Sequence, residues 1–224
     1  MRRILAGALC LCLLILPVRG EETEKYVALT FDDGPSGRFT RKLLEGLEQR
    51  QVKATFALCG YRIQQSPELA QAIFDGGHEI ALHGYSHSCM GHMKAEKVAA
   101  EIQETLLLLP EGCQPAFLRP PGGVLSETVY RTAKQSGFAL LGWSIDPKDW
   151  ATHNADAVES AVEKSVKDGD IILLHDMSDS SVNAALAIID ALAEEGYRFV
   201  TVSALAELRG VEIQSGTLYS RFRP

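Results

Sequence analysis

Two adjacent aspartates, Asp32 and Asp33, follow an apolar run in the stretch VALTFDDGPS. Neighbouring carboxylates repel each other, so a purely structural role gives little reason to place them together. A turn explains one of them, because Asp bonds its own backbone in turns, but a turn does not obviously explain both. The pair favours two separate tasks, in which one carboxylate holds a cation and the other moves a proton.

Two histidines, His83 and His87, are four residues apart. On a helical turn this spacing places both imidazoles on one side, and it is common among zinc ligands. Alone, such a pair is more often an ordinary surface or core feature. With an aspartate on the same face, it makes a set of two His and one Asp, which leaves coordination positions open as catalytic zinc sites do.

Three further segments carry candidate catalytic groups. Arg119 precedes two prolines that restrict the backbone, and a fixed guanidinium can hold a carboxylate through two hydrogen bonds. His175 ends the apolar run DIILL and is either a core histidine or a general acid. Asp149 can pair with either of these two residues, while Trp150 offers a flat surface to a sugar ring. We expect the remaining histidines to be structural: His78, His92 and His153.

Short apolar runs alternate with amphipathic segments along the chain, which predicts parallel strands joined by right-handed helical crossovers. Seven strands are expected, at residues 26–30, 54–58, 79–82, 116–118, 139–144, 170–174 and 198–202. Helical patterns cover residues 66–77, where Ser66 is expected to cap the helix, and residues 94–109, 126–137 and 183–196. A distorted (β/α) barrel of about seven strands and an open doubly wound sheet both fit. No glycine-rich dinucleotide fingerprint follows the first strand, so we favour the barrel.

The candidate catalytic residues all follow predicted strands. In a parallel α/β protein the carboxyl ends of the strands meet on one face, where active sites lie. We therefore expect a single active site at that face of the barrel.

Residues 1–20 have the layout of a secretory signal peptide, with two arginines, an apolar run and small residues before a cleavage point after Gly20. The apolar run is short for a transmembrane span, although an uncleaved signal anchor is the alternative. Residues 21–224 are expected to form one catalytic domain of a secreted or cell-wall-associated protein, with no stable membrane span after cleavage.

Charge and cysteine content indicate which binding partners and which disulfides this chain can have. The chain has a formal net charge of −7, and removing residues 1–20, which hold three arginines and no acids, leaves −10. No basic stripe is available for nucleic acid, so we expect no such partner and a monomer. Three cysteines remain after residue 20, enough for one disulfide at most; we expect buried free thiols instead: Cys59, Cys89 and Cys113.

As an ordered set, TFDDGP, HGYSH, RPPGG, DPKDW and LLH resemble the five motifs of the polysaccharide deacetylases, the NodB-homology or family-four carbohydrate esterases. The resemblance covers nearly all of the chain after residue 25. It implies a distorted (β/α) barrel, a divalent metal with zinc as the expected ion, and hydrolysis of N-acetyl groups on amino sugars. Some members instead remove O-acetyl groups from xylan-type polymers.

Carried onto this sequence, the resemblance implies three metal ligands: Asp33, His83 and His87. Asp32 would be the general base, held by Arg119, and His175 the general acid, oriented by Asp149. Successive side chains at a strand's end point in opposite directions, which would let the adjacent aspartates reach different partners. Substrate contacts would come from three further residues: Gly122, Trp150 and Leu173.

Two positions depart from the family pattern. Gly84 stands where the family usually has Ser or Thr, which implies the loss of a hydrogen bond that supports the metal site. Such a loss typically costs about 10–100-fold in metal affinity or activity. Gly122 stands where an aromatic residue is common, so a platform for a sugar is missing there.

We expect an exported metal-dependent hydrolase that removes N-acetyl groups from an acetylated glycan such as peptidoglycan or a chitin-like polymer. One alternative is a deacetylase of the same fold that acts on small amides or O-acetyl esters. Another is a relative that binds metal or glycan without turnover.

Overall fold

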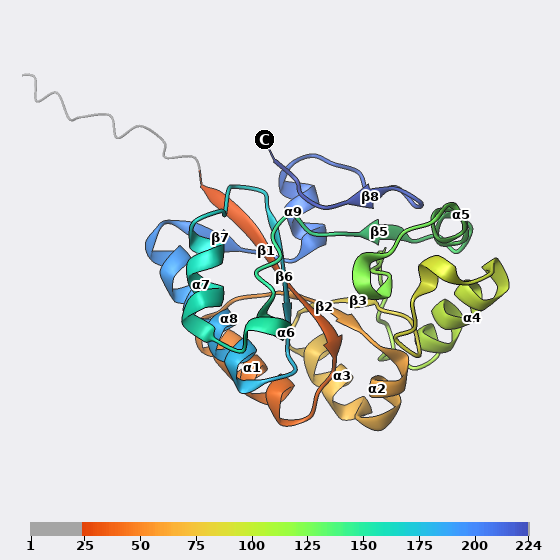
Figure 1. Ribbon diagram of the computed structural model, residues 1–224, viewed down its shortest axis with the longest axis horizontal. Coiled ribbons are helices and arrows are strands. Elements are labelled where there is room, and N and C mark those ends of the chain that lie inside the picture. Colours follow the sequence, from red (N-terminus) through yellow and green to blue (C-terminus); the bar gives the residue numbers. More distant parts are fainter. Residues whose placement is uncertain (1–23, 224) are drawn as a thin grey trace, which may run out of the picture.

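A curled sheet of parallel strands forms the centre of the computed structural model, which describes residues 24–223 (Figure 1). The strand order is β6-β1-β2-β3-β4-β5-β8, and β7 pairs with the first residues of β1. The strands are β1 (Lys25–Gly34), β2 (Thr55–Leu58), β3 (Glu79–Leu82), β4 (Phe117–Leu118), β5 (Ala139–Leu141), β6 (Ile171–His175), β7 (Tyr197–Phe199) and β8 (Leu218–Tyr219). All seven predicted strands are confirmed, and β8 is additional.

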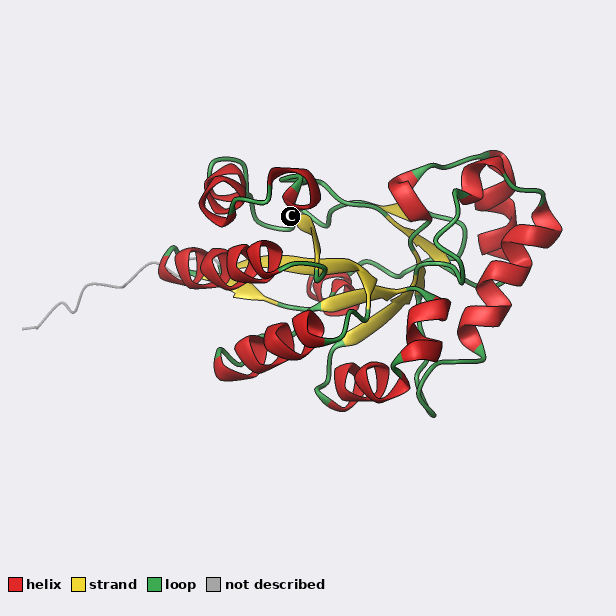
Figure 2. Cartoon of the chain, turned by 60° about the horizontal axis from the view of Figure 1, so that its bottom comes forward, coloured by secondary structure: helices red, strands yellow, loops and turns green. Residues whose placement is uncertain are grey.

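Helices surround the strands on the outside of the sheet (Figure 2). They are α1 (Arg38–Gln49), α2 (Gly60–Gln65), α3 (Pro67–Asp75), α4 (Ala95–Leu106), α5 (Glu127–Gln135), α6 (Asp149–Thr152), α7 (Ala155–Glu163), α8 (Asp179–Glu194) and α9 (Val202–Leu208), with short 3₁₀ turns η1 (Met90–His92) and η2 (Pro121–Gly123). The four predicted helices correspond to α3, α4, α5 and α8. Ser66 does precede α3, but its side chain makes no capping hydrogen bond. Helix α8 begins before the predicted start because the Ser178 hydroxyl accepts a hydrogen bond from the Ser181 N–H and caps it there.

The two faces of β1 have different neighbours. Its residues on one face join the large apolar cluster under α1 and α8: Val27, Leu29 and Phe31. The opposite face belongs to a second apolar cluster, to which β1, β2 and β3 contribute small side chains: Ala28, Ala57 and Ala81. The period of two places Thr30 and Asp32 on this second face. Because its side chains are small, this face leaves room for the fully buried Arg119.

The sheet closes only through isolated contacts between its two ends. Beyond β5, Ile145 forms a parallel bridge to Ile172 of β6, and the Leu173 N–H donates to the Ile145 carbonyl at 2.9 Å. Near the C-terminus, the Phe222 N–H donates to the Gly169 carbonyl just before β6, at 2.7 Å. The predicted distorted (β/α) barrel is confirmed, and the open-sheet alternative is wrong.

Other predictions concern the chain's ends and its thiols. The predicted signal peptide, residues 1–20, lies outside the described residues. Within residues 24–223, no helix has both the length and the apolar character needed to cross a bilayer. The three cysteines in this range are free thiols, of which Cys59 is buried and Cys89 and Cys113 are half-buried.

Candidate active site

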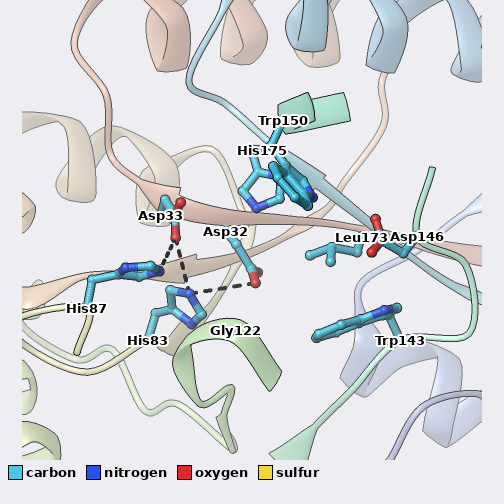
Figure 3. A pocket seen from close by; sticks show the side chains of 10 residues that line it. All are labelled: Asp32, Asp33, His83, His87, Gly122, Trp143, Asp146, Trp150, Leu173 and His175. Carbon is cyan, nitrogen blue, oxygen red and sulfur yellow. Dashed lines mark ion pairs between the residues drawn. The ribbon is translucent and has the colours of Figure 1, made fainter. Parts of the chain in front are cut away.

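A cavity of about 340 Å³ lies where several strands end (Figure 3). Its lining comes from the carboxyl ends of β1 and β6 and from the loops after β3, β4 and β5. Eight of the ten predicted site residues line it: Asp32, Asp33, His83, His87, Gly122, Trp150, Leu173 and His175. The other two, Arg119 and Asp149, are buried behind it and bond to residues that line it. Segments separated by more than 140 positions in the sequence thus meet at one rim of the barrel.

The backbone bulges at Asp33. Asp32 and Gly34 pair with consecutive residues of β2, so Asp33 is an extra residue in the strand, and its φ is 71°. Regular alternation would send the two carboxylates to opposite faces, and that expectation is wrong. The bulge turns Asp33 back to the cavity, so that both side chains approach His83: Asp32 Oδ2 lies 3.7 Å and Asp33 Oδ1 3.2 Å from its Nε2.

Three side chains in this cavity offer ligand atoms that all lie within 4.8 Å of one another: Asp33, His83 and His87. The Oδ1 atom of Asp33 is 2.8 Å from His87 Nε2, and the two imidazole centres are 5.2 Å apart. The predicted helical turn is wrong, because residues 83–87 form an irregular loop in which Gly84 and His87 both have positive φ. The loop brings the two rings together by a different route.

The protonation of His83 suits a cation. Its Nδ1 lies 2.6 Å from the Arg119 carbonyl oxygen; a carbonyl only accepts, so this nitrogen carries the hydrogen. In the neutral ring the lone pair is then on Nε2, directed at Asp33 Oδ1, a buried atom with no hydrogen-bond partner among the described residues. Two lone pairs face each other favourably only with a cation or a proton between them, and two imidazole nitrogens with a carboxylate are donors that zinc accepts. The residues therefore fit a divalent ion.

The charges at the cavity reinforce this arrangement. Burial raises the pKa of Asp33, but the adjacent His83 and His87 rings outweigh it when they are protonated and lower the pKa far below its ordinary value. Conversely, the adjacent Asp33 carboxylate raises the pKa of His87 against the effect of burial. Asp33 is thus held ionised, as a metal ligand must be.

Asp32 is bound to the barrel interior through Arg119. The Arg119 Nη1 donates to Asp32 Oδ1 at 2.6 Å and to the Thr30 hydroxyl at 2.8 Å, and Nη2 donates to the Gly142 carbonyl at 2.8 Å. Because both side chains are buried, this charge-assisted bond is screened little by solvent. It fixes one oxygen of Asp32 and leaves the other, Oδ2, facing His83.

His175 is oriented by both oxygens of Asp149. The His175 backbone N–H donates to Asp149 Oδ2 and its Nδ1 donates to Oδ1, each at 2.9 Å. Burial lowers the pKa of His175, but the hydrogen bond and negative charge of Asp149 outweigh it and raise the pKa above its ordinary value. Of the two partners that the sequence left open for Asp149, the structure pairs it with His175.

Aromatic side chains form the cavity wall away from His83 and His87 (Figure 3). Trp150 is 57% exposed at its mouth, and Leu173 lies between Trp150 and Trp143 in Figure 3. Trp143 and Asp146 also line the cavity, and no role was predicted for either of them. The predicted strand included Trp143, but β5 ends at Leu141, so the sequence did not mark Trp143 as a residue of the loop that reaches the cavity.

Asp176 is a buried acid for which the sequence predicted no role. It accepts a hydrogen bond from the Thr40 hydroxyl, its backbone carbonyl accepts one from the Ser36 hydroxyl, and its Oδ1 has no partner among the described residues. Burial raises the pKa of Asp176 to about 6. It lies behind the loop that follows Asp33 and braces that loop.

Comparison with known proteins places these observations in a family. A family model described as polysaccharide deacetylase matches residues 19–141. The chain is 39% identical over 188 residues to a peptidoglycan-N-acetylglucosamine deacetylase of Bacillus cereus, covering 81% of this chain and 88% of that protein. It is 33% identical to the longer peptidoglycan-N-acetylglucosamine deacetylase PgdA of Listeria monocytogenes, covering 88% of this chain and 42% of that protein. A solved family 4 acetyl xylan esterase from Clostridium thermocellum, in complex with a cobalt ion, superposes with a TM-score of 0.83 at 33% identity, covering 89% of this chain and all of the other.

Proposed function

Because the chain belongs to the polysaccharide deacetylases, carbohydrate esterase family four, we propose that it is an exported hydrolase of N-acetyl groups on amino-sugar polymers. Peptidoglycan is the foremost substrate class, since the two deacetylases compared above act on peptidoglycan by name. The observation that carries the proposal is the convergence of an Asp-His-His set, a second carboxylate and a carboxylate-bound histidine around one cavity.

We propose Asp33, His83 and His87 as the ligands of a divalent ion, with zinc as the ion expected. When bound there, such an ion lowers the pKa of an attacking water towards about 7 and polarises the acetyl carbonyl. His83 donates its other ring N–H to the Arg119 carbonyl, which fixes the ring and keeps Nε2 available as a ligand.

Asp32 is proposed as the general base. Its Oδ1 is held by Arg119, while Oδ2 is directed towards the proposed ion site, so Oδ2 can take the proton of a water that attacks the acetyl carbon. The positive charge of Arg119 offsets the repulsion between the two adjacent carboxylates. In this scheme Asp33 binds the ion and Asp32 accepts the proton.

His175 is proposed as the general acid that protonates the departing amine nitrogen when the carbon–nitrogen bond breaks. Asp149 supports this role because it accepts the Nδ1–H and raises the pKa of the ring, which favours the protonated form that an acid needs. The Gly122 N–H is proposed to donate to the oxyanion. Leu173 and Trp150 are proposed to enclose the acetyl methyl group and the sugar.

The function is tested by measuring acetate release from peptidoglycan, chitooligosaccharides and acetylxylan, with metal analysis of the same protein sample. We expect acetate and free amine from the amino-sugar substrates, loss of both after chelation, and recovery with a divalent ion. Release from acetylxylan alone would favour the O-acetyl esterase alternative. Metal-loaded protein that releases acetate from none of the three would indicate a binding protein.

A further inference from the structure

The loop that carries both proposed histidine ligands has an unusual backbone. Gly84 has φ of 75° and His87 has φ of 59°. For a residue with a side chain, the left-handed region is strained and persists only when surrounding contacts enforce it. The His87 side chain is itself 42% exposed, so burial of the ring does not supply the enforcing contacts.

A carboxylate on the neighbouring helix α4 supplies them. Glu101 is fully buried, and both of its oxygens bond to Ser86, the residue before His87. Its Oε2 accepts the Ser86 backbone N–H and its Oε1 accepts the Ser86 hydroxyl, each at 2.7 Å. The Lys97 ammonium lies 3.4 Å from Oε1. Hydrogen bonds to an ionised acceptor are about twice as strong as neutral ones, and the carboxylate itself is shielded from water.

The carboxylate occupies space that a side chain at position 84 would need. A Cβ atom at Gly84 would lie 3.2 Å from Glu101 Oε2 and 2.6 Å from the Met90 methyl group. The absence of a side chain at position 84 and the presence of a buried carboxylate at position 101 are therefore two parts of one arrangement. The hydroxyl that the family usually has at position 84 is absent from this chain. Here Glu101 of α4 supports the histidine loop instead.

We propose that Glu101 is a positioning residue of the metal site: through Ser86 it fixes the backbone that presents His87 and so raises the affinity of the ligand set for a divalent ion. Glu101 does not line the cavity and touches neither the proposed ion nor the substrate. Glu101 holds the exposed His87 in its strained loop before an ion binds, so that ion binding costs less conformational entropy. This inference rests on the metal site proposed above.

Glu79 offers a matched control for Glu101. The histidine loop follows the last residue of β3, whereas Glu79 is the first residue of that strand. Glu79 likewise accepts hydrogen bonds from the backbone N–H and the hydroxyl of one serine, Ser203, and it also accepts one from the Thr55 hydroxyl. It lies at the start of the strand, away from the cavity. Replacing Glu79 removes the same kind of contact without touching the histidine loop.

The experiment measures the zinc dissociation constant of metal-free protein by chelator competition, alongside thermal unfolding without metal. Glu101→Leu, which removes both acceptors at similar volume, is expected to weaken zinc binding by about 10–100-fold, the usual effect of losing an outer-shell partner. Glu101→Gln retains one acceptor and is expected to give a smaller loss. Glu79→Leu and Glu79→Gln are expected to lower thermal stability but to leave the dissociation constant unchanged.

Ser86→Ala removes the hydroxyl that bonds to Glu101 Oε1 and contacts Ser88, and it keeps the bond from the Ser86 N–H to Glu101 Oε2. It keeps the test decisive if Glu101→Leu does not fold; a loss of a few-fold in affinity is expected. Unchanged zinc affinity in folded Glu101 variants and in Ser86→Ala would overturn the positioning role while leaving the proposed function intact. Equal losses in the Glu79 variants would overturn it too, because the effect would then be general destabilisation. A wild-type protein that binds no divalent ion would refute the metal site itself.

Discussion

Asp32 and Asp33 are neighbours in the sequence, yet they have different partners. Asp32 bonds to the buried Arg119, whereas Asp33 faces His83 and His87. The types of these residues and their place after a strand were evident from the sequence. The bulge at Asp33 was not, because an unpaired residue depends on the register with β2, which the local sequence does not determine.

The division of labour between the two aspartates predicts different failures on substitution. Asp32→Asn keeps the shape and an acceptor for Arg119, so we expect metal affinity near that of the wild type and a loss of acetate release of about 10²–10⁴-fold, typical of a general base. Asp33→Ala removes a ligand, so we expect both metal and activity to be lost. Metal analysis and acetate assays on the same samples decide the matter, and an active Asp32→Asn would refute the base assignment.

The pairing of His175 with Asp149 predicts a shift in the pH profile. The acid must be protonated, so kcat/KM should fall as pH rises through the pKa of His175. Asp149→Asn removes the negative charge that raises this pKa, and the alkaline limb should therefore move to lower pH. An alkaline limb that stays in place, measured with the same substrate and metal, would show that another group controls it.

At the scale of elements, the strand ends were predictable and the loops were not. Apolar runs such as DIILL mark strands buried on both faces, and the residues that follow them reach the cavity as expected. The histidine spacing alone is compatible with a helical turn at residues 83–87, but the structure has an irregular loop there. The path of this loop depends on Gly84, on the left-handed His87 and on the distant Glu101. The contact of Glu101 with the loop cannot be predicted from the local sequence pattern.

The turn after β4 limits where the Trp143 side chain, which lines the cavity, can lie. Gly123 has φ of 67°, and a Cβ atom there would collide with the Trp143 ring. Gly123→Ala should displace the ring and lower kcat/KM, by up to about 100-fold if the displacement approaches 1 Å. Steady-state kinetics on a soluble acetylated oligosaccharide measures this.

Gly137→Ala is the control for that substitution, since Gly137 also has positive φ but has no atom within 4 Å of the added Cβ. Both variants should lose stability through backbone strain, by about 1 kcal/mol or more. Only the change at position 123 should affect the kinetics. Equal kinetic effects in the two variants would show that Trp143 has no part in substrate binding.

At the scale of the whole molecule, alternating strands and helices predicted the barrel, but its closure was missed. Strand β8 has only two residues, which stand between polar residues in the sequence. It is too short to show the alternation of apolar and polar residues that marks a strand. It pairs with β5, and the chain then returns so that Phe222 stacks on Tyr219 with ring centres 5.2 Å apart. Closure depends on the pairing of β8 with β5 and on the bond from the Phe222 N–H to the Gly169 carbonyl. These contacts join residues far apart in the sequence, which no local pattern encodes.

The closing contacts predict a variant that loses stability without losing chemistry. Phe222 is buried, 4% exposed, and does not line the cavity. Phe222→Ala should lower the free energy of unfolding by about 3–5 kcal/mol, the usual range for removing a core aromatic, while zinc affinity at low temperature remains that of the wild type. Urea unfolding and chelator competition measure the two quantities; a parallel loss of zinc affinity would mean that the C-terminal segment also supports the site.

The most direct test of the account is the position of the metal in a crystal of the zinc-loaded protein, read from anomalous scattering at the zinc absorption edge. We predict one strong peak in the cavity, about 2.0–2.2 Å from an Asp33 oxygen and from the Nε2 atoms of His83 and His87. A zinc-loaded crystal with no peak there, or with its peak bound by other residues, would contradict the metal site and the hydrolytic scheme built on it.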